Sequence, residues 1–188
     1  MRKVNQQGRS MVEMLGVLAI IGVLTVGGLS VVGKARQQQE LTQLLSEVAE
    51  IVNAAKKMAC DYDDGYSSYT DMLCSSEANP KGTECGTDGV ITTSSDVTVE
   101  IVAETGSGEG GLKYFVANIG DMSEEACVYL ATSDWGRRNT NGFVGAYFTG
   151  SPSTDAPMDP GVAATSCVES DGVVASTLHL KFLACQKN

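Results

Sequence analysis

The fold of this chain is decided by residues 13–36, which read EMLGVLAIIGVLTVGGLSVVGKAR. The 20 residues from Met14 to Gly33 carry no charged side chain, and that is about the length a helix needs to cross the hydrocarbon core of a bilayer. No later segment of the 188-residue chain is comparable. We therefore expect one membrane-spanning helix near the N-terminus, followed by a single compact domain.

The helical pattern continues beyond the apolar run. Because no proline occurs before Pro80, one helix can extend from about Arg9 to about Cys60, or about 78 Å at 1.5 Å per residue. This second half favours an amphipathic helix half embedded in a soluble domain, with a short coiled-coil stalk as the alternative. Its apolar residues recur at spacings of three and four: Leu41, Leu44, Leu45, Val48, Ile51, Val52, Ala55 and Met58.

The rest of the chain predicts a small antiparallel sheet. Residues 96–104 and 112–119 alternate polar and apolar side chains, and the glycine-rich link of residues 105–111 between them is typical of a hairpin loop. The fold class is therefore α+β, a long N-terminal helix packed on a small antiparallel sheet. The other expected elements are a turn at Asp61–Gly65, a short helix over 69–74, a helix from Asp121 with Glu124 to about Trp135, strands over 143–149 and 177–183, and an exposed proline-rich loop over 151–161.

The charge of the chain is strongly acidic and unevenly placed. The net charge is −10, from 13 Lys+Arg against 23 Asp+Glu, which argues against nucleic acid as a partner because phosphate binding needs clustered basic residues. Arg2 and Lys3 precede the apolar run, and the very short N-terminus favours a cytoplasmic start. The acidic domain would then lie on the other side of the membrane.

All six cysteines follow the apolar run, at Cys60, Cys74, Cys85, Cys127, Cys167 and Cys185. An even number in the exported part favours disulfides formed in an oxidising compartment. A zinc site is the alternative, but the shortest spacing between cysteines is eleven residues and His179 is the only histidine. We expect a disulfide-stapled domain without a metal or cofactor; six cysteines allow fifteen pairings.

The N-terminal segment resembles the precursor signal of type IV pilins. A short basic leader ends at Gly8, and with Arg9 as the first mature residue Glu13 becomes the fifth, the position of the family's glutamate. The run of residues 13–24 is similar to the family's helical signature. The resemblance implies cleavage after Gly8 by a prepilin peptidase, followed by methylation, although Arg9 stands where the family usually has Phe, Met or Leu.

Glu13 is the residue that the resemblance makes functional. A carboxylate costs about 2.5–3.5 kcal/mol if it is carried to the centre of a bilayer, so it needs a partner. In the family that partner is the free N-terminal amine of a neighbouring subunit, and the contact sets axial register. A conventional secretory signal or a plain signal anchor would leave Glu13 without a role.

The order of elements after the long helix resembles the type IVb pilins of enteric bacteria. In that family one disulfide staples the region between the middle helix and the last strands, which implies the pair Cys127–Cys167 here. For the other four cysteines we adopt Cys74–Cys85 inside one loop and Cys60–Cys185 between the helix end and the C-terminus, and the other pairings stay open. The resemblance implies a leader over 1–8, a filament-core helix over 9–36 and a globular pilin domain over 37–188.

The sequence carries no recognisable catalytic constellation. His179 alternates with Leu178 and Leu180, which indicates a surface or packing residue of a strand rather than a base. Gly106–Gly111 lacks the Lys-Ser/Thr that follows a phosphate loop, and the acidic turn at Asp61–Gly65 lacks the pattern of a calcium loop.

We therefore expect a non-enzymatic pilus subunit, major or minor. The precursor would sit in the inner membrane and the mature form in an extracellular polymer with other pilins, with a host or surface receptor as an unidentified further partner. The alternatives are a pseudopilin of a type II secretion or DNA-uptake system, and a membrane-anchored binding protein that never polymerises.

Overall fold

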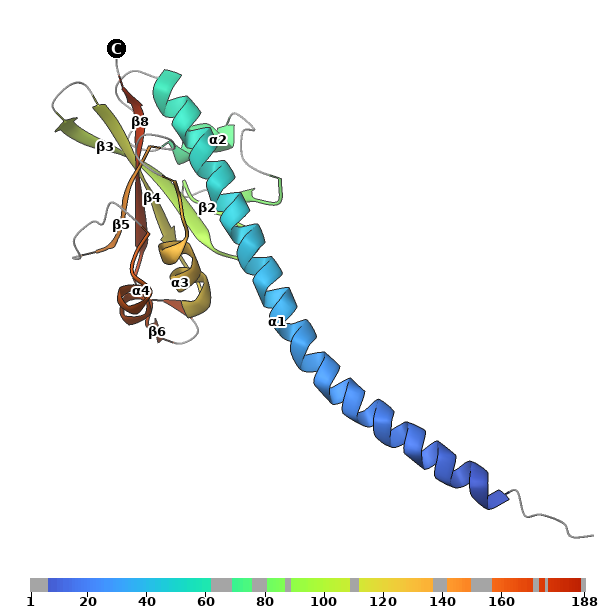
Figure 1. The fold of residues 1–188 in the computed structure, drawn as a ribbon. Helices are drawn as coiled ribbons and strands as arrows, with labels where there is room; N and C mark the ends of the chain where they lie inside the picture. The colour runs from blue at the N-terminus through green and yellow to red at the C-terminus, as the bar shows by residue number, and fades with distance from the viewer. Residues whose placement is uncertain are drawn as a thin grey trace, which may run out of the picture. The chain divides into compact units, whose positions relative to one another are not determined.

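The computed structural model describes residues 7–61, 69–75, 81–86, 89–108, 112–136, 142–149, 157–170, 173–174 and 176–186. The chain divides into two compact units, residues 1–40 and 41–188. The sequence suggested a division after residue 36. Helix α1, Gln7–Asp61, contributes to both units and covers the range expected for one long helix (Figure 1).

Residues 41–188 form a mixed helical and antiparallel unit, as the sequence predicted. The expected hairpin is present as β3, Thr98–Gly108, paired with β4, Leu112–Gly120, so β3 extends further into the glycine-rich link than expected. The other elements are α2 (Thr70–Ser75), β1 (Glu84–Cys85), β2 (Ile91–Thr92), α3 (Glu124–Thr132), β5 (Phe143–Phe148), α4 (Pro160–Ser166), β6 (Glu169–Ser170), β7 (Val173–Val174) and β8 (Leu178–Gln186).

The described strands make a six-stranded sheet in the order β1-β2-β3-β4-β8-β5 and a separate β6-β7 pair. Every pair of neighbours is antiparallel. The last strand of the chain, β8, lies between β4 and β5, so the C-terminal strand is central and β5 lies at an edge. The register shifts between Lys113 and Tyr114 and again between Phe143 and Gly145.

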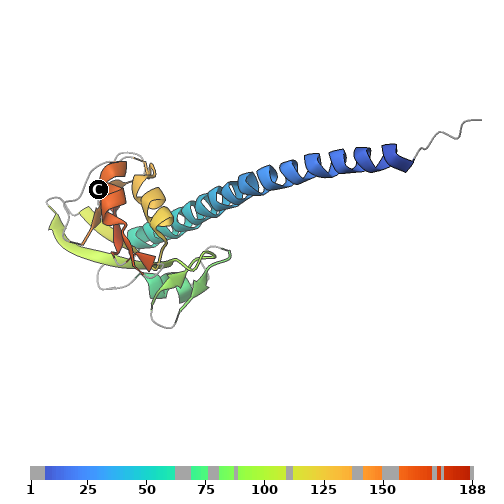
Figure 2. The same cartoon turned by 90° about the horizontal axis from the view of Figure 1, so that it is seen from below.

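The core of this unit lies between one face of the sheet and the helices. Figures 1 and 2 show the second half of α1 and the short helix α3 on the same side of the sheet. The apolar stripe predicted for α1 faces this core, and Val48, Ile51 and Ala55 are fully buried. The sheet contributes the stacked rings of Phe115 and Phe182, whose centroids lie 5.5 Å apart. The predicted amphipathic half of the helix is confirmed.

Trp135 follows α3 in the sequence and belongs to this core. Its side chain is only 6% exposed, and its indole N–H donates to the carbonyl oxygen of Leu130 at 2.9 Å. The indole packs edge-on against Phe182, with 6.4 Å between ring centroids. The hydrogen bond satisfies the one polar atom of a side chain that otherwise behaves as a large hydrophobe.

Glu47 is a buried carboxylate that ties α1 to the turn between β2 and β3. It is 6% exposed and accepts from the backbone N–H of Ser94 at 3.0 Å and from the Ser94 hydroxyl at 2.6 Å. The side-chain amide of Gln43 donates to it at 3.0 Å. Three donors offset the cost of taking the carboxylate out of water, so the contact fixes where this turn meets the helix.

Gly142 precedes β5 in a conformation that favours glycine. Its φ is +75°, and a Cβ built there would lie 2.5 Å from the carbonyl oxygen of Leu183. The Gly142 carbonyl accepts from the Leu183 N–H at 2.6 Å. Only a residue without a side chain allows β5 to start this close to β8.

Two sequence predictions near α3 and α4 were wrong. The N-cap of α3 is Ser123, whose hydroxyl accepts from Ala126 N, whereas Asp121 has a φ of +53° and accepts from the Thr98 hydroxyl. The loop expected over 151–161 does not stay exposed to its end, because Met158 is 4% exposed and Asp159 caps α4. Residues 62–68, which include most of the turn expected at Asp61–Gly65, lie outside the described residues. The same holds for residues 150–156, which include the first part of the expected proline-rich loop.

Candidate functional site

The first half of α1 exposes large apolar side chains. Within the unit of residues 1–40, Met11, Met14, Leu18 and Val23 are each more than 60% exposed. The apolar positions from Met11 to Val23 follow no single stripe but surround the helix axis. A helix that is apolar on all sides is stable only inside a protein assembly or a membrane.

Glu13 lies on this apolar surface and is itself exposed. It is the one charged residue between Met11 and Gly33, and among the described residues it has no hydrogen-bond or ion-pair partner. The backbones of Gly8 and Arg9 lie in the first turn of α1, and the side chain of Arg9 is outside the described part. The chain therefore brings its acid to the apolar surface without supplying a described group to neutralise it.

The same segment contains features that suit an apolar environment. The Thr25 hydroxyl donates to the backbone carbonyl of Ile21 at 2.7 Å, which satisfies it within the helix. A Cβ added at Gly16, Gly22 or Gly33 would meet nothing within 4 Å. Contacts within the chain therefore do not require glycine at these three positions. In the part of the chain that the structure describes, no helix combines the length and the apolar character needed to span a bilayer.

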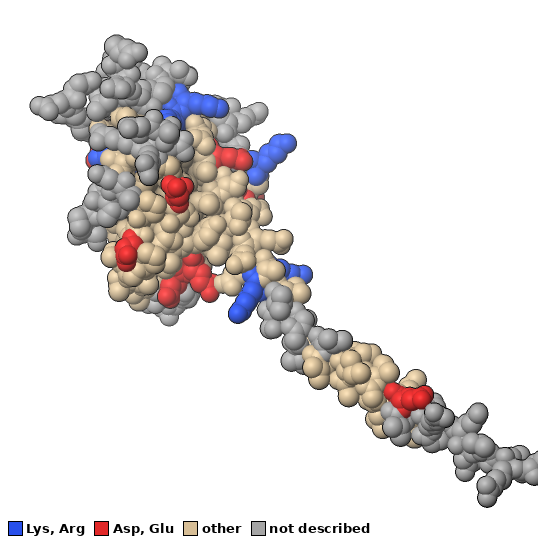
Figure 3. Space-filling view, in the orientation of Figure 1, with Lys and Arg blue, Asp and Glu red and all other residues tan. Residues whose placement is uncertain are grey.

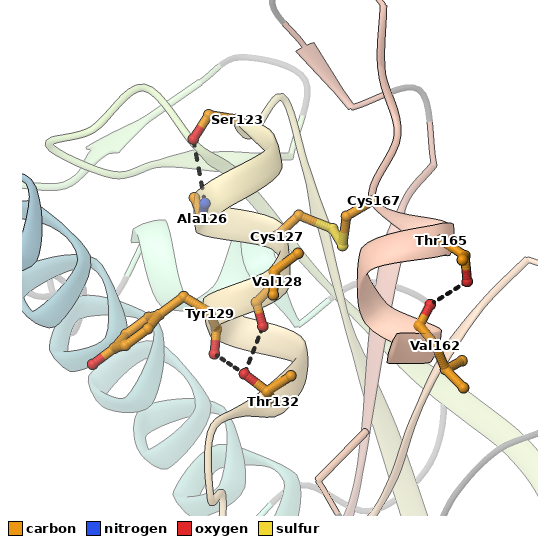
Figure 4. Close-up of a disulfide and its surroundings, with 9 residues drawn as sticks. All are labelled: Ser123, Ala126, Cys127, Val128, Tyr129, Thr132, Val162, Thr165 and Cys167. Carbon is orange, nitrogen blue, oxygen red and sulfur yellow. Dashed lines mark hydrogen bonds between the residues drawn. A yellow bond between two sulfur atoms is a disulfide. The ribbon is translucent and has the colours of Figure 1, made fainter. Parts of the chain in front are cut away.

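Two disulfides join described residues in the globular unit. Figure 4 shows Cys127 of α3 bonded to Cys167 at the end of α4, with Cα atoms 5.8 Å apart. Both cysteines are completely buried. The same view shows the N-cap of α3, where the hydroxyl of Ser123 accepts from the backbone N–H of Ala126 at 3.3 Å. The Cys127–Cys167 disulfide holds α4 against α3.

The second disulfide joins Cys74 of α2 to Cys85 of β1, also with 5.8 Å between Cα atoms. These two disulfides are two of the three pairs that we expected. The backbones of Cys60 and Cys185 lie in α1 and β8, but their side chains lie outside the described residues, so the pair Cys60–Cys185 stays a prediction.

The outer face of the sheet carries a row of directly opposing side chains. Tyr147, His179, Asn118 and Glu100 are register partners across β5, β8, β4 and β3. Nδ1 of His179 lies 2.7 Å from Oδ1 of Asn118, and the Asn118 amide donates to Glu100 at 3.0 Å. The ring of Tyr147 stacks on the imidazole at 4.9 Å. We call these four residues the cross-strand row.

Thr149 extends the row, since its hydroxyl lies 3.0 Å from Nε2 of His179. A hydroxyl, an imidazole and an amide in this order resemble the nucleophile, base and orienting group of a hydrolase. The strand register explains the same contacts without chemistry, because directly opposing side chains on one face must meet. We interpret the row as the contact that holds edge strand β5 on β8.

A second group of charges lies beside the row. Lys181 forms an ion pair with Glu104 and lies over the ring of Tyr114, 4.8 Å from its centroid. Burial raises the pKa of Tyr147, Glu104 raises it further, and Lys181 opposes the change. Burial alone lowers the pKa of His179. At neutral pH both rings are therefore uncharged.

Acidic side chains are spread over the unit of residues 41–188. On the face drawn in Figure 3 they lie in several separate places, and most of the described surface is uncharged. Among the described residues, no three His, Cys, Asp or Glu side chains are grouped so that they could hold a metal ion.

Comparison with known proteins gives information about the fold but not about the sequence family. No family model matches the chain, and no curated protein matches it by sequence. A crystal structure described as a type IV b pilin from Salmonella typhi matches with a TM-score of 0.53 and 20% identity, over 76% of this chain and 97% of that one. This chain has the type IVb pilin fold.

A nuclear magnetic resonance structure of the type IVb pilin PilS from Salmonella typhi is also similar, with a TM-score of 0.48 and 19% identity over 76% of this chain and 96% of that one. The crystal structure confirms the pilin fold that the sequence led us to expect, whereas the processing signal and the role of Glu13 stay predictions. The α+β class, the long helix and the stapling of the pilin domain by disulfides agree with it.

The sequence placed some residues of this pilin domain well and missed others. His179 was expected at the surface or in packing, and it is half-buried in the cross-strand row. Glu47 was not singled out, although an acidic residue inside the apolar stripe was a signal that could have found it.

Proposed function

We propose that the chain is a structural subunit, major or minor, of a type IV pilus. The pilin fold supports this proposal, and one observation carries it: an exposed helix that is apolar on all sides and bears one acid, Glu13, without a described partner. Such a surface needs an apolar surrounding, which the membrane supplies before assembly and neighbouring helices supply afterwards.

In this proposal a prepilin peptidase cuts the chain after Gly8. Cleavage removes residues 1–8 and creates a free amine at Arg9, which methylation would follow. That amine of one copy neutralises Glu13 of the next, and the attraction sets the axial register. In a water-poor surrounding the pair is favoured because each charge alone is costly there.

The cellular path follows from the same arrangement. The precursor lies in the inner membrane with residues 9–36 in the bilayer, and the mature chain lies in an extracellular pilus with the domain of residues 37–188 outward. The disulfides of that domain suit an oxidising compartment. The proposed role is structural rather than enzymatic.

The substitution Glu13→Ala tests the role of the acid. Filament yield is expected to fall at least about tenfold because the register contact is lost, whereas the precursor should still enter the membrane. Glu40→Ala is the matched control, since Glu40 is an exposed acid of the same helix beyond the apolar run. Equal filament yields in the two variants would remove the assembly role of Glu13.

Intact mass spectrometry of sheared filaments tests the processing step. The expected mass is that of residues 9–188, with or without one methyl group. A polymer that retains Met1 would contradict cleavage after Gly8.

The second candidate is a pseudopilin of a type II secretion or DNA-uptake system, which the N-terminal segment would suit equally well. Deleting the gene separates the two functions. Loss of secretion or DNA uptake on deletion, in a strain whose wild-type cells show no filaments, would favour the pseudopilin.

Cross-linking distinguishes a third possibility, a membrane-anchored protein that never polymerises, from the two assembling functions. Leu18→Cys places a thiol on the exposed apolar surface, where the native side chain is 61% exposed. Oxidation should yield cross-linked species only when neighbouring helices lie in contact, so an exclusively monomeric product would support the anchored protein.

A further inference from the structure

The two described disulfides differ sharply in exposure. Cys127 and Cys167 are each 0% exposed, whereas Cys85 is exposed and Cys74 is half-buried. Thiol–disulfide exchange requires an attacking thiolate to reach a sulfur atom, so access strongly affects its rate. A reductant in solution can therefore approach Cys74–Cys85 while the folded domain shields Cys127–Cys167.

Helix α2 is held in the fold independently of its disulfide. The backbone N–H of Tyr69 donates to the carbonyl of Ile101 at 3.0 Å, and the Ile101 N–H donates to the Thr70 hydroxyl at 2.8 Å. Leu73 is fully buried in the core. Breaking the bond at Cys74 would leave these contacts to β3 in place.

Strand β1 has much weaker non-covalent support. It consists of Glu84 and Cys85, both exposed, and pairs with β2 through two residue pairs, with one further backbone hydrogen bond from the N–H of Gly86 to the carbonyl of Val90 at 2.8 Å. By contrast, β2 carries the fully buried Ile91 and pairs onward with β3. The disulfide is therefore the strongest described tie between β1, the edge of the sheet, and the rest of the domain.

We propose that the Cys74–Cys85 disulfide is a redox switch that keeps β1 on the edge of the sheet when oxidised and releases it when reduced. We call this disulfide the latch. A dithiol opens it in two steps: one thiolate attacks the sulfur of Cys85, the exposed residue of the pair, and expels the Cys74 thiolate, which takes up a proton. The second thiol of the reductant then displaces Cys85 as a thiol and closes a cyclic disulfide. Two electrons pass from the dithiol to the protein, and oxidation reverses the change.

Opening the latch changes which strand forms the edge. With β1 released, β2 presents its outer N–H and C=O groups to solvent, and such unpaired groups can accept an added strand. The contacts of α2, β3, β4 and β8 stay intact, so the domain remains folded in both redox states.

Graded dithiothreitol treatment of the full chain in detergent tests the latch. Free thiols are alkylated at each time point and assigned by peptide mapping, which also separates Cys60 and Cys185 from the two pairs of interest. Cys74 and Cys85 should become labelled at least about tenfold faster than Cys127 and Cys167. Equal labelling rates, or the opposite order, would overturn the proposal.

Hydrogen exchange on the selectively reduced protein tests the structural consequence. The amides of β1 should be protected in the oxidised protein and lose protection on reduction, while those of β3, β4 and β8 keep theirs. If β1 is unprotected before reduction, or remains protected after it, the bond is not a latch.

The paired substitution Cys74→Ser with Cys85→Ser should reproduce the exchange pattern of the reduced protein. Cys127→Ser with Cys167→Ser is the matched control, and in that variant β1 should stay protected if the domain folds. Since reduction of the folded wild-type chain gives the same readout, the test does not depend on the variants folding.

Discussion

Nδ1 of His179 donates a hydrogen bond to Oδ1 of Asn118, 2.7 Å away, and the direction of that bond follows from a third residue. The Asn118 amide nitrogen donates to Glu100, so its oxygen must face the imidazole. The proton therefore lies on Nδ1, and Nε2 accepts from the hydroxyl of Thr149. The neutral imidazole satisfies both neighbours without an added proton.

This relationship predicts that acid weakens the fold below pH 6.5, the ordinary pKa of a histidine. Burial lowers the pKa of His179, so between the ordinary value of 6.5 and the lowered value the unfolded chain binds a proton that the folded chain does not. The free energy of unfolding should fall as pH decreases through that window and level off below it. The slope cannot exceed about 1.4 kcal/mol per pH unit, and it should be smaller because the ring is partly exposed.

Urea unfolding of the full chain in detergent at pH 7.5 and pH 5.5 measures this effect. His179→Gln is the control, because His179 is the only histidine in the chain. The difference in pH dependence between wild type and variant isolates the imidazole, and identical profiles would contradict the prediction.

Gly142→Ala should destabilise the pilin domain by about 2–4 kcal/mol. The new Cβ would lie 2.5 Å from the Leu183 carbonyl, at a φ of +75° that strains an alanine. Gly33→Ala is the matched control, because its Cβ meets nothing within 4 Å and alanine favours a helix by up to about 1 kcal/mol. Urea unfolding should separate the two variants, and a small effect at Gly142 would show that β5 can shift.

Glu47→Gln should cost about 1–3 kcal/mol of unfolding free energy. The carboxylate accepts from three donors on Ser94 and Gln43, and an amide in its place turns one acceptor into a donor that faces another donor. Glu50→Gln alters an exposed acid on the same helix and should stay within about 0.5 kcal/mol of wild type. A comparable loss in both variants would mean that the buried contact is not the cause.

Removing Cys127–Cys167 should destabilise the domain more than removing Cys74–Cys85. The first closes a loop with a sequence separation of 40 and the second one of 11, for which chain entropy predicts about 4 and about 3 kcal/mol. Burial widens the gap, because the sulfurs of the first pair lie within the core and serine would leave unpaired hydroxyls there. Thermal unfolding of the two paired serine variants checks the order.

Helices α1, α2 and α3 and the main hairpin could be predicted because their signals are local. The stripe containing Val48, Ile51 and Ala55 repeats with the period of a helix, and the alternation in residues 96–104 repeats with that of a strand. Strands β1, β2, β6 and β7 are only two residues long, too short for any period to appear. A start signal for α4 was present in Asp159-Pro160, but the number of prolines favoured a loop.

The cross-strand row could not be predicted because its residues are far apart in sequence. His179 meets Asn118 only because β8 inserts between β4 and β5, and the register depends on irregularities at Lys113 and Phe143 that have no sequence signature. The exposure that distinguishes Cys85 from Cys167 is likewise a property of the packed domain. Cysteine spacing alone carries no information about it.

Trp135 supplies an intrinsic optical probe of one unit only. It is the sole tryptophan and packs against Phe182, so no other indole contributes to the emission of the chain. Its fluorescence should shift to the red when water enters the domain of residues 41–188, and it should be blind to melting of residues 7–40. Read together with helical ellipticity, the emission would resolve whether the two units lose their structure in one transition or in two.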